Sequence, residues 1–537
     1  MKNGPTHHGA VLLFSASVIC SCSWSTDAVS LDRDALKKVR ARKHQELRHN
    51  RSWPFLNEVL VIMSDDMRPE LSGYGHLNMK TPNTAELGRS GFTFQHAYVQ
   101  FAVCGPSRTS LLTGRRPDTS RVWNNEVNFR DTKGLDWTTL PQFFKESGYR
   151  SIGMGKVFHK NQDETSSRGG SWSVPHGNEG DPYSAYNPAK NISSFLEVDA
   201  PWDNFRDGRE TAKAIKWISN ASMYEKPFFL MVGLHLPHIP YVYPKAFRYK
   251  GPKNFPPKNY KLTKDIPDIA VHDWTREAAK FNDMWRFKSH FLERKDSVGL
   301  CDALPTQNQW ELKQAYLSSI QYVDFLIGKL MDALKAAEIY DQTTIVVFGD
   351  HGYKLGEHCS WFKHDNYELS TRFPLILKPS ASLGLQAGRH INQLVEAVDI
   401  YPSLAEMTSL KVPGGLDGQS WLPLLQDAKA TGKSGAFSQY QHKKCMGYSL
   451  RTEQFRYTEW LENNCDLADP MSKCSDPAKV KPNWKNRCGT ELYDHRKTMP
   501  NTLDEGEDEN LAGKPEYAKI ERRLHTQLVR EWKTPTS

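Results

Sequence analysis

Short apolar runs alternate with amphipathic stretches along most of this chain. Residues 60–63 and 344–348 are almost wholly apolar and end abruptly in polar residues, a pattern typical of strands buried on both faces of a parallel sheet. Further strands are expected over 149–153 and 227–234, and helices over 140–147, 212–223 and 308–337. This alternation predicts an α/β fold in which a large mixed, mostly parallel sheet is flanked by helices.

The pattern changes near residue 430. Polar and apolar positions alternate over 435–440, 447–452 and 455–460, which predicts antiparallel strands, and a final helix is expected over 515–532. We therefore expect a main domain over 53–432 and a smaller C-terminal α+β subdomain over 433–537. Residues 240–305 have little periodicity and are long for a plain loop, so we interpret them as an excursion that faces a ligand.

The N-terminus has the pattern of an export signal. The apolar run at residues 10–22 is too short and too rich in Ser and Cys for a membrane helix, but it suits the core of a signal peptide. Little helical periodicity supports the alternative, a buried N-terminal helix. We expect a signal peptide over 1–27 and a basic leader or pro-segment over 28–52. No later run is long enough to predict stable insertion in a membrane.

The net charge of +8 is concentrated near the N-terminus. Residues 32–51 hold eight Lys and Arg against three acidic residues, so the rest of the chain is almost neutral. The basic balance is therefore weak support for an anionic partner, and no motif indicates nucleic-acid binding.

The nine cysteines fall into three groups. Two lie in the expected signal peptide, and Cys104 stands apart. In an oxidising compartment the others would form disulfides, with a pairing that the sequence does not reveal. A zinc site is the alternative, although the spacings match no usual pattern. These six are Cys301, Cys359, Cys445, Cys465, Cys474 and Cys488.

Two pairs of residues that could bind a metal ion follow predicted strands. Asp65 and Asp66 come directly after the run 60–63, and Asp350 and His351 follow 344–348. In an α/β sheet the carboxyl ends of the strands form the ligand-binding edge, where adjacent carboxylates favour a hard divalent cation. Each pair alone could equally be solvated loop residues, but together they predict a shared metal site.

The stretch 104–115, CGPSRTSLLTGR, is the third candidate. Pro106 and Ser107 suit the first turn of a helix, so Cys104 would lie at its positive end, where anions are favoured. From the residues alone, Cys104 could be a structural cysteine or a catalytic thiolate.

This stretch resembles the modification motif of the sulfatase family, Cys-x-Pro-Ser-Arg followed by Leu-Thr-Gly-Arg, at every defining position. His159 follows Lys156 by three places instead of the commoner two, which is similar to the branch of the family that acts on 2-O-sulfated iduronate. Other similarities, spread over nearly all of 55–515, lie at 116–119, 148–159, 235–240, 350–358, 361–363, 446–452 and 491–512.

The resemblance implies an alkaline-phosphatase/sulfatase-like fold and a site built around residue 104. The formylglycine-generating enzyme would oxidise Cys104 to Cα-formylglycine during export. One Ca²⁺ would be held by Asp65, Asp66, Asp350 and His351 together with residue 104. Because Ca²⁺ prefers oxygen ligands, His351 could instead bind the sulfate or the aldehyde hydrate. The groups implied around the sulfate are Arg108, Lys156, His159, His238 and Lys363.

The implied activity is that of an exo-sulfatase. It would hydrolyse the 2-O-sulfate ester of terminal iduronate or other uronate residues in heparan sulfate and dermatan sulfate oligosaccharides. His238 or Lys363 would protonate the departing alcohol, and His159 would take up a proton during sulfate release. The expected location is the lysosome, reached through the secretory pathway, or the extracellular space, and acidic conditions would keep the histidines protonated.

Two other functions stay open. The chain could be another formylglycine-dependent sulfatase, or a phosphonate or phosphodiester hydrolase of the same superfamily. It could also be a non-catalytic glycan-binding homologue, although every matched catalytic position is intact.

Overall fold

The structure is a computed structural model that describes residues 57–159, 170–174, 176, 194–224, 226–272, 274, 300–301, 305–463, 482–498, 503 and 506–533. The expected signal peptide and basic leader lie outside these ranges, as do Cys465 and Cys474. Among the helices of the described ranges, none has both the length and the apolar composition needed to cross a membrane.

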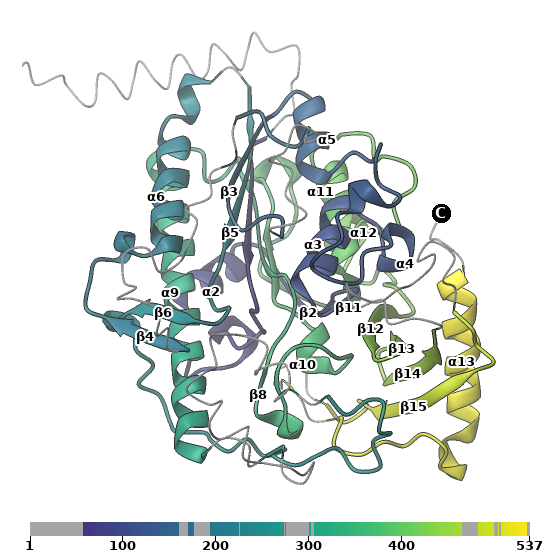
Figure 1. Ribbon diagram of the computed structural model, residues 1–537. Coiled ribbons are helices and arrows are strands. Elements are labelled where there is room, and N and C mark those ends of the chain that lie inside the picture. Colours follow the sequence, from purple (N-terminus) through teal and green to yellow (C-terminus); the bar gives the residue numbers. More distant parts are fainter. Residues whose placement is uncertain are drawn as a thin grey trace, which may run out of the picture. The chain divides into compact units, whose positions relative to one another are not determined.

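A seven-stranded sheet forms the centre of the main part, in the order β11-β2-β10-β7-β1-β5-β3 (Figure 1). Strand β1 pairs in parallel with both β5 and β7, whereas β10 runs antiparallel to its two neighbours. The predicted mixed, mostly parallel sheet is thus confirmed. Its strands are β1 Val59–Ser64, β2 Phe92–Tyr98, β3 Arg150–Gly155, β5 Phe228–Leu234, β7 Thr344–Gly349, β10 Leu375–Lys378 and β11 Arg389–Glu396.

Strand β1 is apolar throughout because both of its faces are buried. Leu60 and Ile62 pack into one hydrophobic core, and Val61 and Met63 pack into the other. A strand with two buried faces loses the alternation that marks a half-exposed strand. The abrupt change at Asp65 therefore marks the end of the strand and the start of the site.

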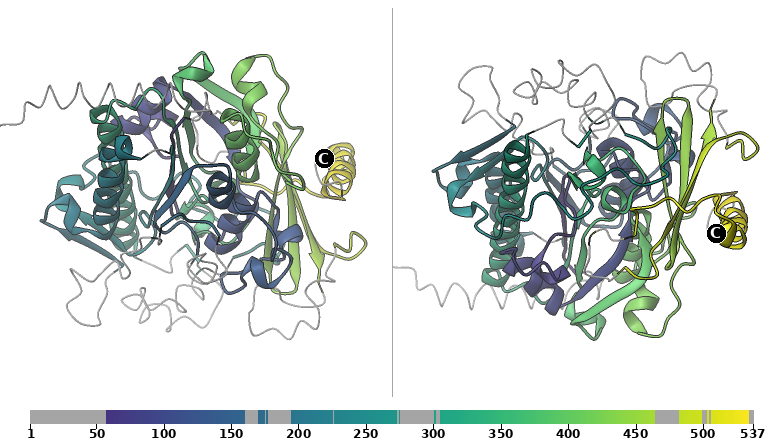
Figure 2. Two further views of the ribbon diagram at one scale, coloured as in Figure 1. Left: turned by 90° about the horizontal axis from the view of Figure 1, so that it is seen from above. Right: turned by 90° about the horizontal axis from the view of Figure 1, so that it is seen from below.

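Helices cover both faces of the sheet (Figure 2). One face carries α2 Pro82–Arg89, α6 Arg206–Ser219 and α9 Thr306–Ala336. The other carries α3 Cys104–Thr113, α5 Leu140–Glu146, α11 Ile400–Met407 and α12 Leu422–Gln426. The remaining short elements are α4 Pro117–Ser120, α10 Glu368–Thr371, the strand pair β4 Phe195–Val198 with β6 Tyr241–Pro244, and the hairpin β8 Lys354–Leu355 with β9 Trp361–Phe362.

Helix α6 begins and ends earlier than the predicted 212–223. Its first turns bury Asp207, Gly208 and Glu210, none of which contributes an apolar signal. The periodicity of the sequence therefore indicated only the later turns of the helix.

The C-terminal part is a four-stranded antiparallel sheet, β12-β13-β14-β15, with one long helix packed on it. Leu524 and Leu528 of the helix are fully buried against the sheet. The predicted α+β character is confirmed, but β15 was missed because its first two residues are exposed and the strand lacks alternation. The elements are β12 Ala436–His442, β13 Cys445–Arg451, β14 Phe455–Glu462, β15 Arg487–Asp494 and α13 Ala518–Lys533.

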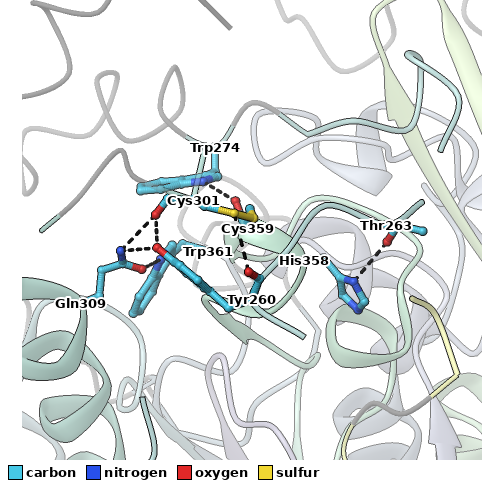
Figure 3. Close-up of a disulfide and its surroundings, with 8 residues drawn as sticks. All are labelled: Tyr260, Thr263, Trp274, Cys301, Gln309, His358, Cys359 and Trp361. Atoms are coloured by element: carbon cyan, nitrogen blue, oxygen red, sulfur yellow. Dashed lines mark hydrogen bonds between the residues drawn. A yellow bond between two sulfur atoms is a disulfide. The ribbon is translucent and has the colours of Figure 1, made fainter. Parts of the chain in front are cut away.

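Two disulfides join four of the six remaining cysteines. Cys301 pairs with Cys359 (Figure 3), and Cys445 pairs with Cys488 across the C-terminal sheet. Cys104 is a free, buried cysteine.

Candidate active site

The two predicted pairs, Asp65 with Asp66 and Asp350 with His351, meet at the carboxyl ends of the neighbouring strands β1 and β7. The backbone N–H of Asp66 donates to Oδ1 of Asp350 over 3.0 Å. Asp66 itself has φ of 62°, in the left-handed region, which turns the chain sharply after the strand. Tyr316 of α9 supports this turn by donating from its hydroxyl to the carbonyl of Asp66 over 2.7 Å.

Cys104 is the first residue of α3, and its side chain faces these carboxylates. Its Sγ lies 3.2 Å from Oδ1 of Asp65 and 3.5 Å from Nε2 of His351. The helix start is held in place by Asn125, whose side chain accepts the Gly105 N–H over 2.8 Å. The positive end of the helix dipole favours an anion beside Cys104.

Three cationic side chains surround the same point. Lys363 Nζ lies 3.1 Å from Cys104 Sγ and pairs with Asp66, and Lys156 Nζ lies 3.8 Å from the sulfur and pairs with Asp65. Arg108 donates from Nε to Oδ2 of Asp350 over 2.8 Å and is completely buried. The site therefore combines three carboxylates with three cations around one sulfur atom.

The histidines lie at different positions relative to this centre. His238 Nε2 is 3.9 Å from Oδ2 of Asp66, while its Nδ1 is hydrogen-bonded to the carbonyl of Ile239. His351 Nε2 lies 3.4 Å from Asp66 and 3.5 Å from Asp350. His159 follows Lys156 on the loop after β3, and its Nδ1 has no hydrogen-bond partner among the described residues.

His235 was assigned no site role from the sequence, but it belongs to this group. One of its ring nitrogens lies within 4.8 Å of both an Asp65 carboxylate oxygen and a His238 ring nitrogen. Asn125 and Tyr316 were also missed, because they come from distant segments and stand in no local motif. The proline-rich stretch around His235 and His238 was the only sequence signal that pointed to a constrained turn here.

The charges strongly perturb the acids of the site. Burial alone would raise the pKa of Asp65, but Lys156, His238 and Arg108 outweigh it and hold this pKa well below its usual range. For Asp66, burial prevails over Lys363 and His238, so its pKa is raised. Burial and Asp65 oppose ionisation of the Cys104 thiol, yet Lys156 and Lys363 keep its pKa lowered.

The histidines do not share one protonation state. Burial, reinforced by Lys156 and Arg108, lowers the pKa of His159 to about 3. Burial also lowers the pKa of His238, against the attraction of Asp66. For His351, burial is overcome by Asp350, and the pKa rises to about 9. The prediction that acidic conditions keep all site histidines protonated is therefore wrong for His159, which burial keeps neutral.

The arrangement of donor atoms fits a divalent cation. Ligand atoms of Asp65, Asp66, Cys104 and His351 all lie within 4.8 Å of one another, and all four residues are buried. Asp350 adds an oxygen 3.5 Å from His351 Nε2. Carboxylate oxygens from three aspartates suit a hard cation, and adjacent buried carboxylates gain from one.

Comparison with known protein families matches most of the chain. A family described as "Sulfatase" matches residues 57–410, and one described as "N-sulphoglucosamine sulphohydrolase, C-terminal" matches residues 356–493. The chain is also 31% identical to iduronate 2-sulfatase of Homo sapiens over 512 residues, covering 80% of this chain and 90% of that protein.

Solved structures share the fold. One protein, solved in complex with its substrate D-glucosamine-2-N,6-O-disulfate, superposes with a TM-score of 0.65 at 21% identity, covering 89% of this chain and 98% of its own. A phosphonate monoester hydrolase from Silicibacter pomeroyi superposes with a TM-score of 0.64 at 20% identity, covering 89% and 96%. At these identities the likeness is one of fold.

Proposed function

Since the chain belongs to the sulfatase family, we propose that it is an exo-acting sulfatase that hydrolyses the 2-O-sulfate ester of terminal iduronate or other uronate residues in heparan sulfate and dermatan sulfate. The identity with iduronate 2-sulfatase over most of both chains supports this substrate class, as does the three-residue spacing from Lys156 to His159. The observation that carries the proposal is the position of Cys104 Sγ, 3.2 Å from Asp65 and 3.1 Å from Lys363.

Two groups would complete the site. Asp65, Asp66 and Asp350, with His351 and residue 104, would hold one Ca²⁺, which when bound supplies positive charge beside the sulfate oxygens. Residue 104 would be converted to Cα-formylglycine by the formylglycine-generating enzyme. Its hydrate supplies two geminal hydroxyls, so that sulfate can be both accepted and released.

The side chains of the protein would bind the substrate and stabilise the transition state. Lys156, Lys363 and Arg108 would draw the sulfate ester, which is a monoanion, into a buried site and would offset the negative charge that builds up in the transition state. Arg108 also fixes the Asp350 carboxylate through its 2.8 Å contact.

The histidines would move protons. His238 or Lys363 would give a proton to the departing sugar alcohol, since both face Asp66 at the centre of the site. His159 would take up a proton during sulfate release, and a bound sulfate ester would offset Lys156 and Arg108, which together with burial lower its pKa.

We also propose that the chain is exported and acts in the lysosome, with secretion as the alternative. The pattern of residues 10–22 and the two disulfides support an oxidising route. Fractionation of cells that express the full chain would show sulfatase activity with lysosomal markers or in the medium. Retention in the cytosol would contradict this location.

A substrate panel tests the proposed activity. Purified full-length protein, with formylglycine at residue 104 verified by mass spectrometry, is assayed on four substrates. These are a disaccharide with a terminal 2-O-sulfated iduronate, a 6-O-sulfated glucosamine, an aryl sulfate and an aryl phosphodiester. We expect the first to have the highest kcat/KM, and Cys104→Ala to abolish that turnover.

Each other outcome of the panel has a distinct meaning. A preference for the 6-O-sulfated sugar would keep the sulfatase activity but refute the uronate substrate. Dominant turnover of the phosphodiester would replace the proposal with a phosphodiester or phosphonate hydrolase. If protein with formylglycine at residue 104 hydrolyses none of the four substrates, the alternative of a non-catalytic glycan-binding homologue would be favoured.

A further inference from the structure

The backbone around Lys363 is unusual. Phe362 and His364, which flank it, have φ of 75° and 83°, and His358 and Cys359 at the tip of the preceding hairpin have φ of 51° and 56°. Left-handed conformations cost residues other than glycine about 1–3 kcal/mol each and persist only where the surroundings impose them. Something must therefore hold the segment 356–364 in place.

A disulfide holds the tip of the hairpin. Cys359, which is buried, forms a disulfide with Cys301, which precedes α9 in the sequence (Figure 3). The indole N–H of Trp274 donates to the Cys359 carbonyl over 2.9 Å. The hairpin between β8 and β9 is thus joined covalently to the excursion that the sequence analysis placed at 240–305.

Gln309 of α9 ties the same parts together by hydrogen bonds (Figure 3). Its Nε2 donates to the Tyr260 hydroxyl over 2.6 Å and to the Cys301 carbonyl over 3.2 Å, and its Oε1 accepts the indole N–H of Trp361 over 3.2 Å. Tyr260 in turn donates to the Cys301 carbonyl. One amide side chain therefore links the excursion, the disulfide and strand β9, which directly precedes Lys363.

His358 adds a third anchor. Its backbone N–H donates to the carbonyl of Asn259 over 2.9 Å, and its ring nitrogens contact Thr263 Oγ1 at 3.1 Å and Asn259 Nδ2 at 3.3 Å. Both ring nitrogens are engaged by the excursion, so this histidine orients the hairpin and does not face the site. The anchors fix the segment on both sides of its tip.

We infer that the Cys301–Cys359 disulfide and the contacts of Tyr260, Gln309 and His358 position Lys363 for the reaction. Lys363 is the second residue after Trp361, and its ammonium reaches both Asp66 and Cys104. The described residues of the excursion then act as a brace for the segment that carries Lys363. This inference rests on the proposed function, because it treats Lys363 as part of the catalytic group.

The test compares two disulfide variants. Cys301→Ala/Cys359→Ala removes the proposed brace, and Cys445→Ala/Cys488→Ala, the matched control, removes a disulfide far from Lys363 in the sequence. With equal formylglycine content, the first should lower kcat on an aryl sulfate by about 10- to 100-fold, the cost of a displaced catalytic group, with KM changed less than about twofold. The control should leave kcat of the folded protein within about twofold.

Two further measurements separate positioning from general structure. Amide hydrogen exchange in peptides covering 354–366 should speed up in the first variant and not in the control. In a Lys363→Ala background, removal of Cys301–Cys359 should change the remaining rate less than about twofold, because its effect passes through Lys363. If the first variant does not fold, Tyr260→Phe takes its place, and a smaller effect in the same direction is expected.

The result that overturns the inference is unchanged exchange at 354–366, or an equal loss of kcat with and without Lys363. If wild-type protein turns over no sulfate ester, the proposed function fails, and the exchange measurement still decides whether the disulfide holds the Lys363 segment.

Discussion

At the scale of single residues, the site depends on opposite charges held together out of water. Lys363 has its pKa raised well above the usual range, because Asp66 and Cys104 outweigh the effect of burial. Each aspartate has a cationic partner, so no buried charge is left alone. A sulfate ester bound as proposed would compete with the aspartates for these same cations.

Cys104→Ala should abolish sulfatase turnover and leave the protein folded. The side chain is small and buried, so its loss should cost no more than about 1–2 kcal/mol of unfolding free energy. Loss of the nucleophile should lower kcat by at least about 10⁴-fold. Rates on the preferred substrate and the thermal melting temperature measure both effects. Retained turnover would refute the assignment of residue 104.

Removal of divalent metal should also stop turnover. We expect a chelator to reduce the rate to near background and added Ca²⁺ to restore it, since the site would lose the positive charge that the ion would supply beside the sulfate oxygens. The melting temperature should fall in chelator, because a ligand bound only by the folded state stabilises it. Full activity in chelator would rule out the metal site.

At the scale of the elements, a turn between β5 and β6 presents His235 and His238 to the site. The carboxylate of Asp207, buried at the start of α6, accepts the backbone N–H of His235 over 2.9 Å and that of Leu236 over 2.8 Å. Ser64 at the end of β1 donates to the carbonyl of Leu236 over 2.6 Å. A helix start and a strand end thus hold the turn from two sides.

Asp207→Asn should loosen this turn. An amide can accept only one of the two N–H donors and sets its own NH₂ against the other, so we expect a loss of about 1–3 kcal/mol in unfolding free energy. If His238 acts in catalysis, kcat/KM should fall about tenfold through its displacement. Asp203→Asn, an exposed carboxylate just before the same helix, is the control for both measurements. If Asp207→Asn and Asp203→Asn have equal unfolding free energies and equal kcat/KM, Asp207 does not hold the turn in place.

The sequence predicted the elements with a strong apolar signal and missed those without one. Strands β1 and β7 were found because both of their faces are buried, which leaves a continuous apolar run, and helix α9 was found because apolar residues recur along its length. Helix α6 was found only in part and β15 not at all, since their first residues are polar or exposed. Cys104 and Arg108 stand in a motif, whereas Asn125, Tyr316 and Asp207 reach the site only through tertiary structure. No local pattern could have revealed them.

At the scale of the whole molecule, the two sheets are joined by a buried ionic network. Glu368 of α10 accepts from Arg451 over 3.0 Å and from Arg456 over 2.6 Å, and Arg456 also donates to Glu507 over 2.7 Å. The triad of Glu368, His495 and Glu507 could in principle hold a metal, but the arginines already satisfy its carboxylates. The junction is therefore a salt-bridge network, which specifies how the sheets meet.

Glu491 of β15, near this junction, should make stability depend on pH. Burial raises its pKa to about 7 from 4.5, although Tyr493 and Trp460 donate to its carboxylate. The folded state thus keeps a proton that the unfolded state loses, so the contribution of Glu491 to stability is fully present below pH 4.5 and is lost as the pH rises towards 7. The expected loss over this window is about 3 kcal/mol.

Glu491→Gln should remove that part of the dependence. The amide can accept from Trp460 and donate to the Tyr493 hydroxyl, so the buried contacts are kept without ionisation. Chemical denaturation between pH 4.5 and 7 gives the slope of unfolding free energy against pH for the wild type and the variant. Glu453→Gln, at an exposed position in the turn between β13 and β14, should leave the slope unchanged. Parallel slopes for wild type and Glu491→Gln would contradict the assignment.

The burial of Cys104 also has a consequence for biosynthesis. Only 2% of the surface of this residue is exposed in the folded protein, where it is the first residue of helix α3. If residue 104 is converted to formylglycine as proposed, the modifying enzyme would have to reach the thiol before the chain folds around it. We therefore expect protein made in a host without that enzyme to fold and to show no sulfatase turnover, and treatment with the enzyme after folding not to restore it.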